Sequence, residues 1–153
     1  MEFRDDEQIL TYHNTLVYGS DLRIMQSQNA WLNDACINFF MSVLQHSPDT
    51  RHNKFVDPSV ISCLMHQCTD EDDIEDFRKG FDLVTDGKLF IAVNDNMRLG
   101  ANWMIPNSGN HWSLLAIVFE GGKAVAAWHF DSMQSSDNIN AAAYSMNSQQ
   151  SFK

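Results

Sequence analysis

The sequence predicts an α+β fold in which helices come first and a small, mostly antiparallel sheet follows. In the first half of the chain, apolar residues recur at three- and four-residue steps, as they do in amphipathic helices. The second half contains short apolar runs separated by turn residues, which is typical of strands. At 153 residues, the chain is long enough for one domain with a substantial core.

The N-terminal part is predicted to begin with a strand and to continue with a helix. Residues 10–19, LTYHNTLVYG, favour a strand or extended segment because β-branched and aromatic residues precede a glycine. Residues 27–45 favour a helix because their apolar residues have helical spacing, and Ser27 or Asn29 would cap its start.

A second helix is predicted over residues 57–68. Asp57 is a good capping residue, and Pro58 suits the first helical position because that position needs no N–H donor. A short acidic helix is expected after it, up to Gly80.

Three strands are predicted in the second half, over residues 88–94, 111–119 and 124–131. The turn EGG at residues 120–122 is short enough to join the last two strands as an antiparallel hairpin. A long polar loop at residues 95–110 separates the first two, and such loops are more often functional than idle.

Charge excludes one broad class of partner. The formal net charge of -10 argues against nucleic acid, because binding to phosphates relies on Lys and Arg. The acidic run DEDDIED at residues 70–76 is typical of a solvated helix start. The alternative interpretation is an acidic patch that steers a basic protein partner.

Composition also bears on the compartment. No apolar run approaches the ~20 residues needed to cross a bilayer, and the N-terminus is acidic where a signal peptide would be basic. The odd number of cysteines (Cys36, Cys63 and Cys68) fits a reducing environment. We therefore expect an intracellular protein, cytoplasmic and/or nuclear, that contacts no membrane and needs no cofactor.

Two residues at the ends of the last two strands could form a catalytic pair. The turn is centred near Gly121, ten residues from both His111 and Asp131, so an antiparallel hairpin would bring the two side chains together. Asp131 shares its strand face with His129. A carboxylate beside an imidazole fixes its tautomer and stabilises its protonated form, as in a nucleophile–base–carboxylate triad.

Three other interpretations remain open at this point. His111 could be a core histidine with satisfied hydrogen bonds. His111, His129 and Asp131 could bind a metal, although no H-E-x-x-H motif accompanies them. A serine hydrolase would also use His and Asp, but the sequence contains no G-x-S-x-G turn.

Several motifs resemble the Ulp/sentrin-specific cysteine proteases, which cut ubiquitin-like modifiers from their targets. WLND at residues 31–34, HWSLL at 111–115 and HFDS at 129–132 occur in the family's order and spacing. AVNDN at residues 92–96 makes the chain most similar to the deneddylase branch, although the SUMO-processing branch shares the first two motifs. The resemblance covers about residues 10–133.

The resemblance implies a papain-like thiol-protease fold and a role for particular residues. His111 would be the general base and Asp131 its orienting carboxylate. Trp31 and Trp112 would line a narrow channel for the Gly-Gly tail of a Nedd-type modifier, or alternatively a SUMO-type one, because flat indoles exclude bulkier tails. Trp31 could instead be a core anchor. Asp34 would contact the modifier or complement the first helical turn.

The nucleophile departs from the family pattern. The family places its cysteine in a D-C-G turn beyond the aspartate, whereas no cysteine follows Asp131 here. Cys36 lies among apolar helical neighbours and is interpreted as a core residue, and Cys63 and Cys68 are assigned to structure as well.

The missing nucleophile leads to two accounts of the chain. In the first, residues 1–133 are the N-terminal portion of a protease domain that is incomplete at its C-terminus, and residues 134–153 are a truncated helical or disordered tail. Such a fragment would be inactive and, with part of its sheet uncovered, marginally stable. In the second, the chain is a modifier-binding module without catalysis. In either case, the loop at residues 95–110 could close over the modifier.

Overall fold

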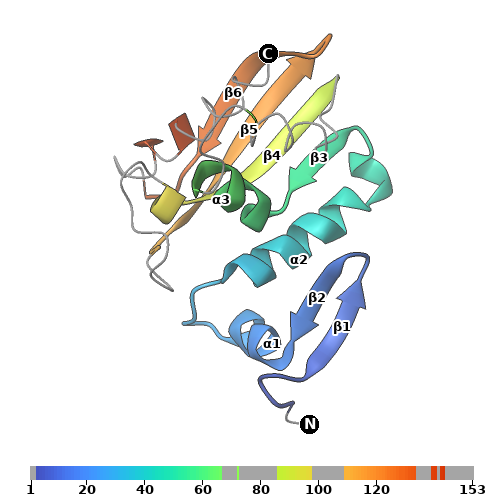
Figure 1. Ribbon diagram of the computed structural model, residues 1–153, viewed down its shortest axis with the longest axis vertical. Coiled ribbons are helices and arrows are strands. Elements are labelled where there is room, and N and C mark those ends of the chain that lie inside the picture. The colour runs from blue at the N-terminus through green and yellow to red at the C-terminus, as the bar shows by residue number, and fades with distance from the viewer. Residues whose placement is uncertain are drawn as a thin grey trace. The chain divides into compact units, whose positions relative to one another are not determined.

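The computed structural model describes two compact units, residues Met1–Arg51 and His52–Lys153. Figure 1 shows the helices and the hairpin of the first unit and the larger sheet of the second. The described residues are 3–66, 72, 86–97, 109–133, 139–140 and 142–143.

The first unit begins with a β-hairpin rather than with one strand. β1 (Gln8–Tyr12) pairs antiparallel with β2 (Thr15–Tyr18), so the segment predicted as a single extended element contains a turn. His13 in this turn has a φ of 51°, in the left-handed region that a two-residue hairpin turn requires. The sequence prediction missed the turn because no glycine marks it. α1 (Gly19–Gln26), which was not predicted, follows directly.

The helix predicted over residues 27–45 begins later than expected, as α2 (Asp34–Gln45). Its cap is Asn33, whose side-chain oxygen accepts a hydrogen bond from the Cys36 amide at 2.8 Å. The hydroxyl of Ser27 instead accepts from the Ala30 amide and stabilises the turn ahead of the helix. The predicted caps were therefore wrong, and the WLND motif opens the helix because its asparagine is the cap.

Asn33 also joins α2 to α1. Its side-chain nitrogen donates to Oδ1 of Asp21 at 2.9 Å, and the other oxygen of Asp21 accepts from the Tyr18 amide at 3.0 Å. Asp21 is only 5% exposed, and a carboxylate buried to this degree is tolerated only where hydrogen bonds replace water. The two helices of the first unit are thus connected by a satisfied polar contact.

The second unit is built on a sheet with the strand order β3-β4-β5-β6 within the described residues (Figure 1). β3 (Asn53–Val56), which was not predicted, pairs parallel with β4 (Gly87–Asn94). β4 pairs antiparallel with β5 (Trp112–Glu120), and β5 pairs antiparallel with β6 (Lys123–Phe130). The prediction of helices followed by a small, mostly antiparallel sheet is confirmed.

α3 (Pro58–His66) begins where the sequence predicts and packs against β4. The carboxylate of Asp57 accepts from the Ser59 amide at 2.8 Å, and Pro58 occupies the first helical position. The acidic helix expected up to Gly80 lies outside the described residues. Short 3-10 turns at Pro48–Thr50 and Asp95–Met97 complete the described elements.

One face of the sheet forms the core of the second unit. Alternate residues of β4 and β5 on this face have almost no exposed surface, and α3 covers them. Burial of each such side chain contributes about 1.5–3 kcal/mol relative to exposure. The buried cluster consists of Val56, Ile61, Leu89, Ile91, Val93, Leu115 and Ile117.

The last two strands meet in a tight hairpin, as predicted. Glu120 pairs with Lys123, so Gly121 and Gly122 form a two-residue turn with φ values of 56° and 74°. Only glycine adopts such angles without steric cost, and they match the twist of the strands. On the face of β6 opposite to the core, Trp128 and Phe130 are 52% and 58% exposed.

No helix in the described part of the chain is long and apolar enough to cross a membrane. The helical or disordered tail predicted at residues 134–153 lies largely outside the described residues, as do the middle of the 95–110 loop and all but Asp72 of the acidic run.

We predict that Asn33→Ala lowers the free energy of unfolding by about 1–2 kcal/mol, because the substitution removes the helix cap and the hydrogen bond that Asp21 Oδ1 accepts from Asn33. Urea denaturation measures this change. Asn29→Ala is the matched control, and it should change stability by less than about 0.5 kcal/mol. Equal losses in the two variants would contradict the position of the cap.

Candidate active site

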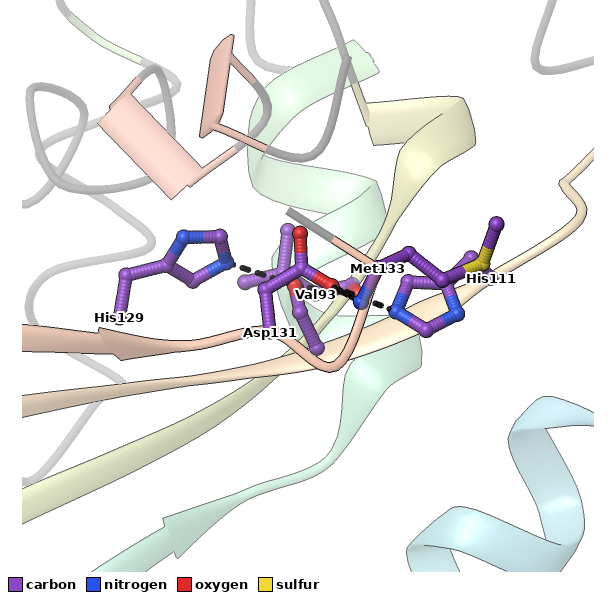
Figure 2. Close-up of polar contacts among 6 residues, drawn as sticks. Val93, His111, His129, Asp131 and Met133 are labelled. Carbon is purple, nitrogen blue, oxygen red and sulfur yellow. Dashed lines mark hydrogen bonds and ion pairs between the residues drawn. The ribbon is translucent and has the colours of Figure 1, made fainter. Parts of the chain in front are cut away.

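His111 and Asp131 are in direct contact in the second unit. His111 Nε2 lies 2.8 Å from Asp131 Oδ1, and their side chains are only 11% and 4% exposed. In Figure 2 the His111 ring points toward the Asp131 carboxylate. A carboxylate only accepts hydrogen bonds, so the proton of the neutral imidazole is on Nε2. The described residues offer Nδ1 no hydrogen-bond partner, so this nitrogen can accept a proton from a reacting group.

The β5–β6 hairpin creates this contact. Its ladder ends with the pair Leu114–Phe130, and Asp131 follows directly, at the end of β6. His111 precedes β5 by one residue. The carboxylate of Asp131 also accepts from the Met133 amide at 2.9 Å, which turns the chain after the strand and holds the carboxylate in place. The proximity predicted from the turn is therefore present in the structure.

Asp95 positions the backbone of His111 from the neighbouring strand. The Asp95 amide donates to the His111 carbonyl at 3.1 Å, and the Asp95 carboxylate accepts from the Asn110 amide at 2.8 Å. These two contacts hold the end of the loop against the end of β4. Asp95 therefore supports the site without touching the imidazole.

Asn94 and Gly109 form a second close contact between the same segments. A Cβ at Gly109 would overlap the side-chain amide of Asn94, so a larger residue there would require the Asn94 side chain to move. The Asn94 side-chain oxygen also accepts from the Asn96 amide at 2.9 Å. The AVNDN segment, expected from the sequence only as a family motif, thus holds both ends of the loop through Asn94 and Asp95.

His129 does not contact Asp131, although the two residues share a strand face. Its Nε2 lies 2.8 Å from the hydroxyl of Ser113 instead. Within the described residues, no group of three His, Cys, Asp or Glu side chains is placed to hold a metal ion. The alternative of a metal bound by His111, His129 and Asp131 therefore has no geometric support.

The two tryptophans proposed for a tail channel belong to different units. Trp31 precedes α2 and is 70% exposed, which contradicts the alternative of a core anchor. Trp112 is the first residue of β5 and packs, partly buried, against the core cluster. Asp34 is exposed at the first position of α2, and its Oδ1 accepts from the Ala35 amide at 3.1 Å, so it complements the helix start.

Cys36 is buried and poorly suited to be a nucleophile. It has no exposed surface, and its thiol donates to the Asp21 carbonyl at 3.6 Å. Burial, together with the negative charges of Asp21 and Asp34, raises the pKa of the Cys36 thiol above its ordinary value. Because the thiolate is the reactive form, the structure supports the interpretation of Cys36 as a core residue. Cys63 is partly buried on α3, and Cys68 lies outside the described residues.

This geometry defines a class of chemistry. A buried imidazole, held in one tautomer by a carboxylate and with its second nitrogen available, is the base-and-orienter half of a nucleophilic hydrolase. The pair can take a proton from a thiol or hydroxyl and stabilise the resulting imidazolium.

Sequence comparison is consistent with this class. The chain is 33% identical over 128 residues to NEDD8-specific protease 1 of Arabidopsis thaliana, covering 84% of this chain and 53% of that protein. It is 28% identical over 140 residues to the Dictyostelium discoideum protein named Probable sentrin-specific protease 8, covering 88% of this chain and 56% of that protein. The chain thus spans about half the length of these curated relatives.

No family model matches the chain. A solved structure of the Xanthomonas campestris effector protein XopD bound to ubiquitin matches with a TM-score of 0.47 and 25% identity, covering 78% of this chain and 60% of that chain. The similarity to the curated proteases places the chain in a family: it belongs to the Ulp/sentrin-specific proteases of ubiquitin-like modifiers.

Alkylation tests the assignment of Cys36. At neutral pH, we expect iodoacetamide to modify Cys36 in the native chain at least about tenfold more slowly than in urea, since each unit by which a thiol pKa rises lowers the thiolate fraction tenfold. Mass spectrometry of the tryptic peptide measures the rate. Equal alkylation rates in the native and denatured chain would show that Cys36 is a reactive thiol.

The raised pKa of Cys36 also makes the free energy of unfolding depend on pH. It is retained at neutral pH and falls as the pH rises above 9.0, because the thiol of the unfolded chain ionises first.

The role of Asp95 can be measured by hydrogen exchange. Asp95→Ala removes the acceptor of the Asn110 amide, so we expect exchange of that amide to accelerate about tenfold. Asp95→Asn keeps a side-chain oxygen in the same place and should have a smaller effect. Unchanged exchange in the alanine variant would mean that this contact does not hold the loop.

Proposed function

We propose that this chain supplies the general base and the modifier-binding surfaces of a cysteine protease that cleaves a Nedd-type ubiquitin-like modifier after its Gly-Gly tail. One observation carries the proposal: the buried contact between His111 Nε2 and Asp131 Oδ1 in a chain of this family. In this proposal, residues 1–133 are part of a papain-like thiol-protease fold and residues 134–153 are its tail.

Each member of the pair has one task. His111 takes the proton of a thiol through Nδ1 while its Nε2–H stays bonded to Asp131. The Asp131 carboxylate holds the ring in place and stabilises the positive charge that the imidazole gains. The thiolate attacks the carbonyl carbon of the last glycine, and the scissile C–N bond breaks as His111 passes its proton to the leaving amine, which leaves a thioester. Water then hydrolyses the thioester to a carboxylate and restores the thiol, with His111 again as the base.

The two tryptophans are proposed to select the substrate tail. Trp31 exposes most of its indole, which is unusual for a residue whose burial is normally favourable. A tail that ends in two glycines offers no side chains to grip, so walls of flat rings can select it by excluding larger residues. In this proposal, Trp31 and Trp112 each present a flat ring to the tail, and Asp34, which is exposed at the start of α2, contacts the body of the modifier.

Two observations support a Nedd-type rather than a SUMO-type modifier. The Arabidopsis thaliana relative is named for its specificity for NEDD8. The AVNDN segment at residues 92–96 also resembles the deneddylase branch.

A second candidate function is modifier binding without catalysis. No cysteine follows Asp131 in the sequence, and Cys36 is buried with a raised thiol pKa. We therefore propose that the 153-residue polypeptide alone binds a modifier and does not cleave it.

Binding and cleavage measurements on this polypeptide separate the two functions. We expect saturable binding of a Nedd-type modifier by calorimetry, and no processing of a modifier precursor. Trp31→Ala and Trp112→Ala should each weaken binding about tenfold or more, as for aromatic residues at interfaces. Trp128→Ala is the matched control, because it removes an exposed indole outside the proposed channel.

Three results would decide against this account. Turnover that survives His111→Ala would remove the proposed role of the imidazole. Labelling of Cys36 by a modifier that bears a C-terminal electrophile would identify an unexpected nucleophile. Equal effects of the three tryptophan substitutions, or tighter binding of a SUMO-type modifier, would contradict the channel or the choice of substrate.

A further inference from the structure

A second polar contact lies on the core face of the sheet, beside the His111–Asp131 pair (Figure 2). His129 Nε2 lies 2.8 Å from Ser113 Oγ, and Ser113 Oγ lies 3.4 Å from the carbonyl oxygen of Val93. The contact therefore joins three adjacent strands: β6 through His129, β5 through Ser113 and β4 through Val93. The proposed chemistry of His111 and Asp131 makes no use of it.

The Val93 carbonyl can only accept, so Ser113 Oγ donates to it. With the hydroxyl proton used in this way, Ser113 Oγ accepts from His129 in the tautomer that carries its proton on Nε2. Ser113 is 8% exposed, so this arrangement satisfies a hydroxyl that water hardly reaches.

The position of this contact in the hairpin is informative. The last backbone pair of the β5–β6 ladder is Leu114–Phe130, so Asp131 lies one residue beyond the ladder and Ser113 occupies the facing position on β5. The end of β6 also has little packing on its other face, where Trp128 and Phe130 are more than half exposed. Backbone pairing and apolar packing alone would leave the segment that bears Asp131 weakly held.

We propose that His129 is a positioning residue: through Ser113 it holds the end of β6 against β5, in the register that brings Asp131 to His111. The hydrogen bond runs diagonally across the strands, from His129 on β6 to Ser113 on β5. The His111–Asp131 bond runs in the same direction, because Asp131 lies two residues after His129 and His111 lies two residues before Ser113. A shift of one residue at this end would turn Asp131 to the opposite face of the sheet.

The importance of His129 for cleavage rests on the proposed function, whereas its effect on the position of Asp131 does not. The Met133 amide reports on the carboxylate directly, because its acceptor is Asp131 Oδ1 at 2.9 Å. Hydrogen exchange at this amide therefore measures whether the carboxylate stays in place, in the 153-residue chain and without substrate.

The experiment compares variants by amide hydrogen exchange. His129→Leu keeps the apolar bulk but removes the donor, and it should accelerate exchange at Met133 about tenfold. His129→Gln places a side-chain N–H where Nε2 was, and exchange should stay within about twofold of the wild-type rate. Ser113→Ala should match His129→Leu, and the double variant should exceed neither single variant, because both remove one contact.

Trp128→Leu is the matched control on the opposite face of β6, and exchange at Met133 should stay within about twofold. If His129→Leu does not fold, Ser113→Ala provides the same test with the loss of a single oxygen atom. The proposal is overturned if the leucine or alanine variant exchanges at the wild-type rate, if glutamine behaves like leucine, or if Trp128→Leu has the same effect. Failure of the chain to bind a modifier would contradict the proposed function and leave the hydrogen-exchange result at Met133 unaffected.

Discussion

The structure around the site depends on one buried hydrogen bond between His111 and Asp131 across the end of a β-hairpin. A carboxylate that is 4% exposed is expensive to bury, and it persists only where donors replace the lost water. The imidazole and the Met133 amide are two such donors. Because both residues lie just outside the β5–β6 ladder, their meeting depends on the strand register and therefore on the two glycines of the distant turn.

The other polar contacts of the second unit support the same corner of the sheet. Asp95, directly after β4, bonds to the backbone of His111, and Ser113 lies between Val93 and His129 on the core face. The apolar cluster under α3 gives the strands a rigid base. In the first unit, Asn33 and Asp21 serve an equivalent purpose, since they fasten the start of α2 directly after the exposed Trp31.

The sequence could predict those features that depend on local patterns. The strands β4, β5 and β6, the glycine turn and the Asp57–Pro58 start of α3 each have a strong local signature, and the His111–Asp131 contact follows from counting residues across that turn. The hairpin at His13 was missed because its turn contains no glycine. β3 was missed because a four-residue strand that pairs in parallel with a distant segment has little signature of its own.

The cap of α2 and the supporting side chains show a different limit. Ser27, Asn29 and Asn33 are all good caps by residue type, and only the contact with Asp21, twelve residues earlier, selects Asn33. Ser113 and His129 act through partners on other strands, and Asp95 acts through Asn110 and His111 at the far end of the loop, so one sequence gives no sign of their roles. Their residue types were visible in the HWSLL, HFDS and AVNDN motifs, but the partners become evident only when the strands are paired.

Nitrogen NMR of the histidine side chains tests the central claim most directly. In the ¹⁵N-labelled chain at a pH where His111 is neutral, the account predicts that this ring carries its proton on Nε2, with a strongly downfield N–H signal from the bond to the carboxylate. Asp131→Ala should abolish that signal and leave the His52 spectrum unchanged. A ring that exchanges freely between tautomers, or a signal that survives the substitution, would contradict the His111–Asp131 pair and with it the proposed protease chemistry.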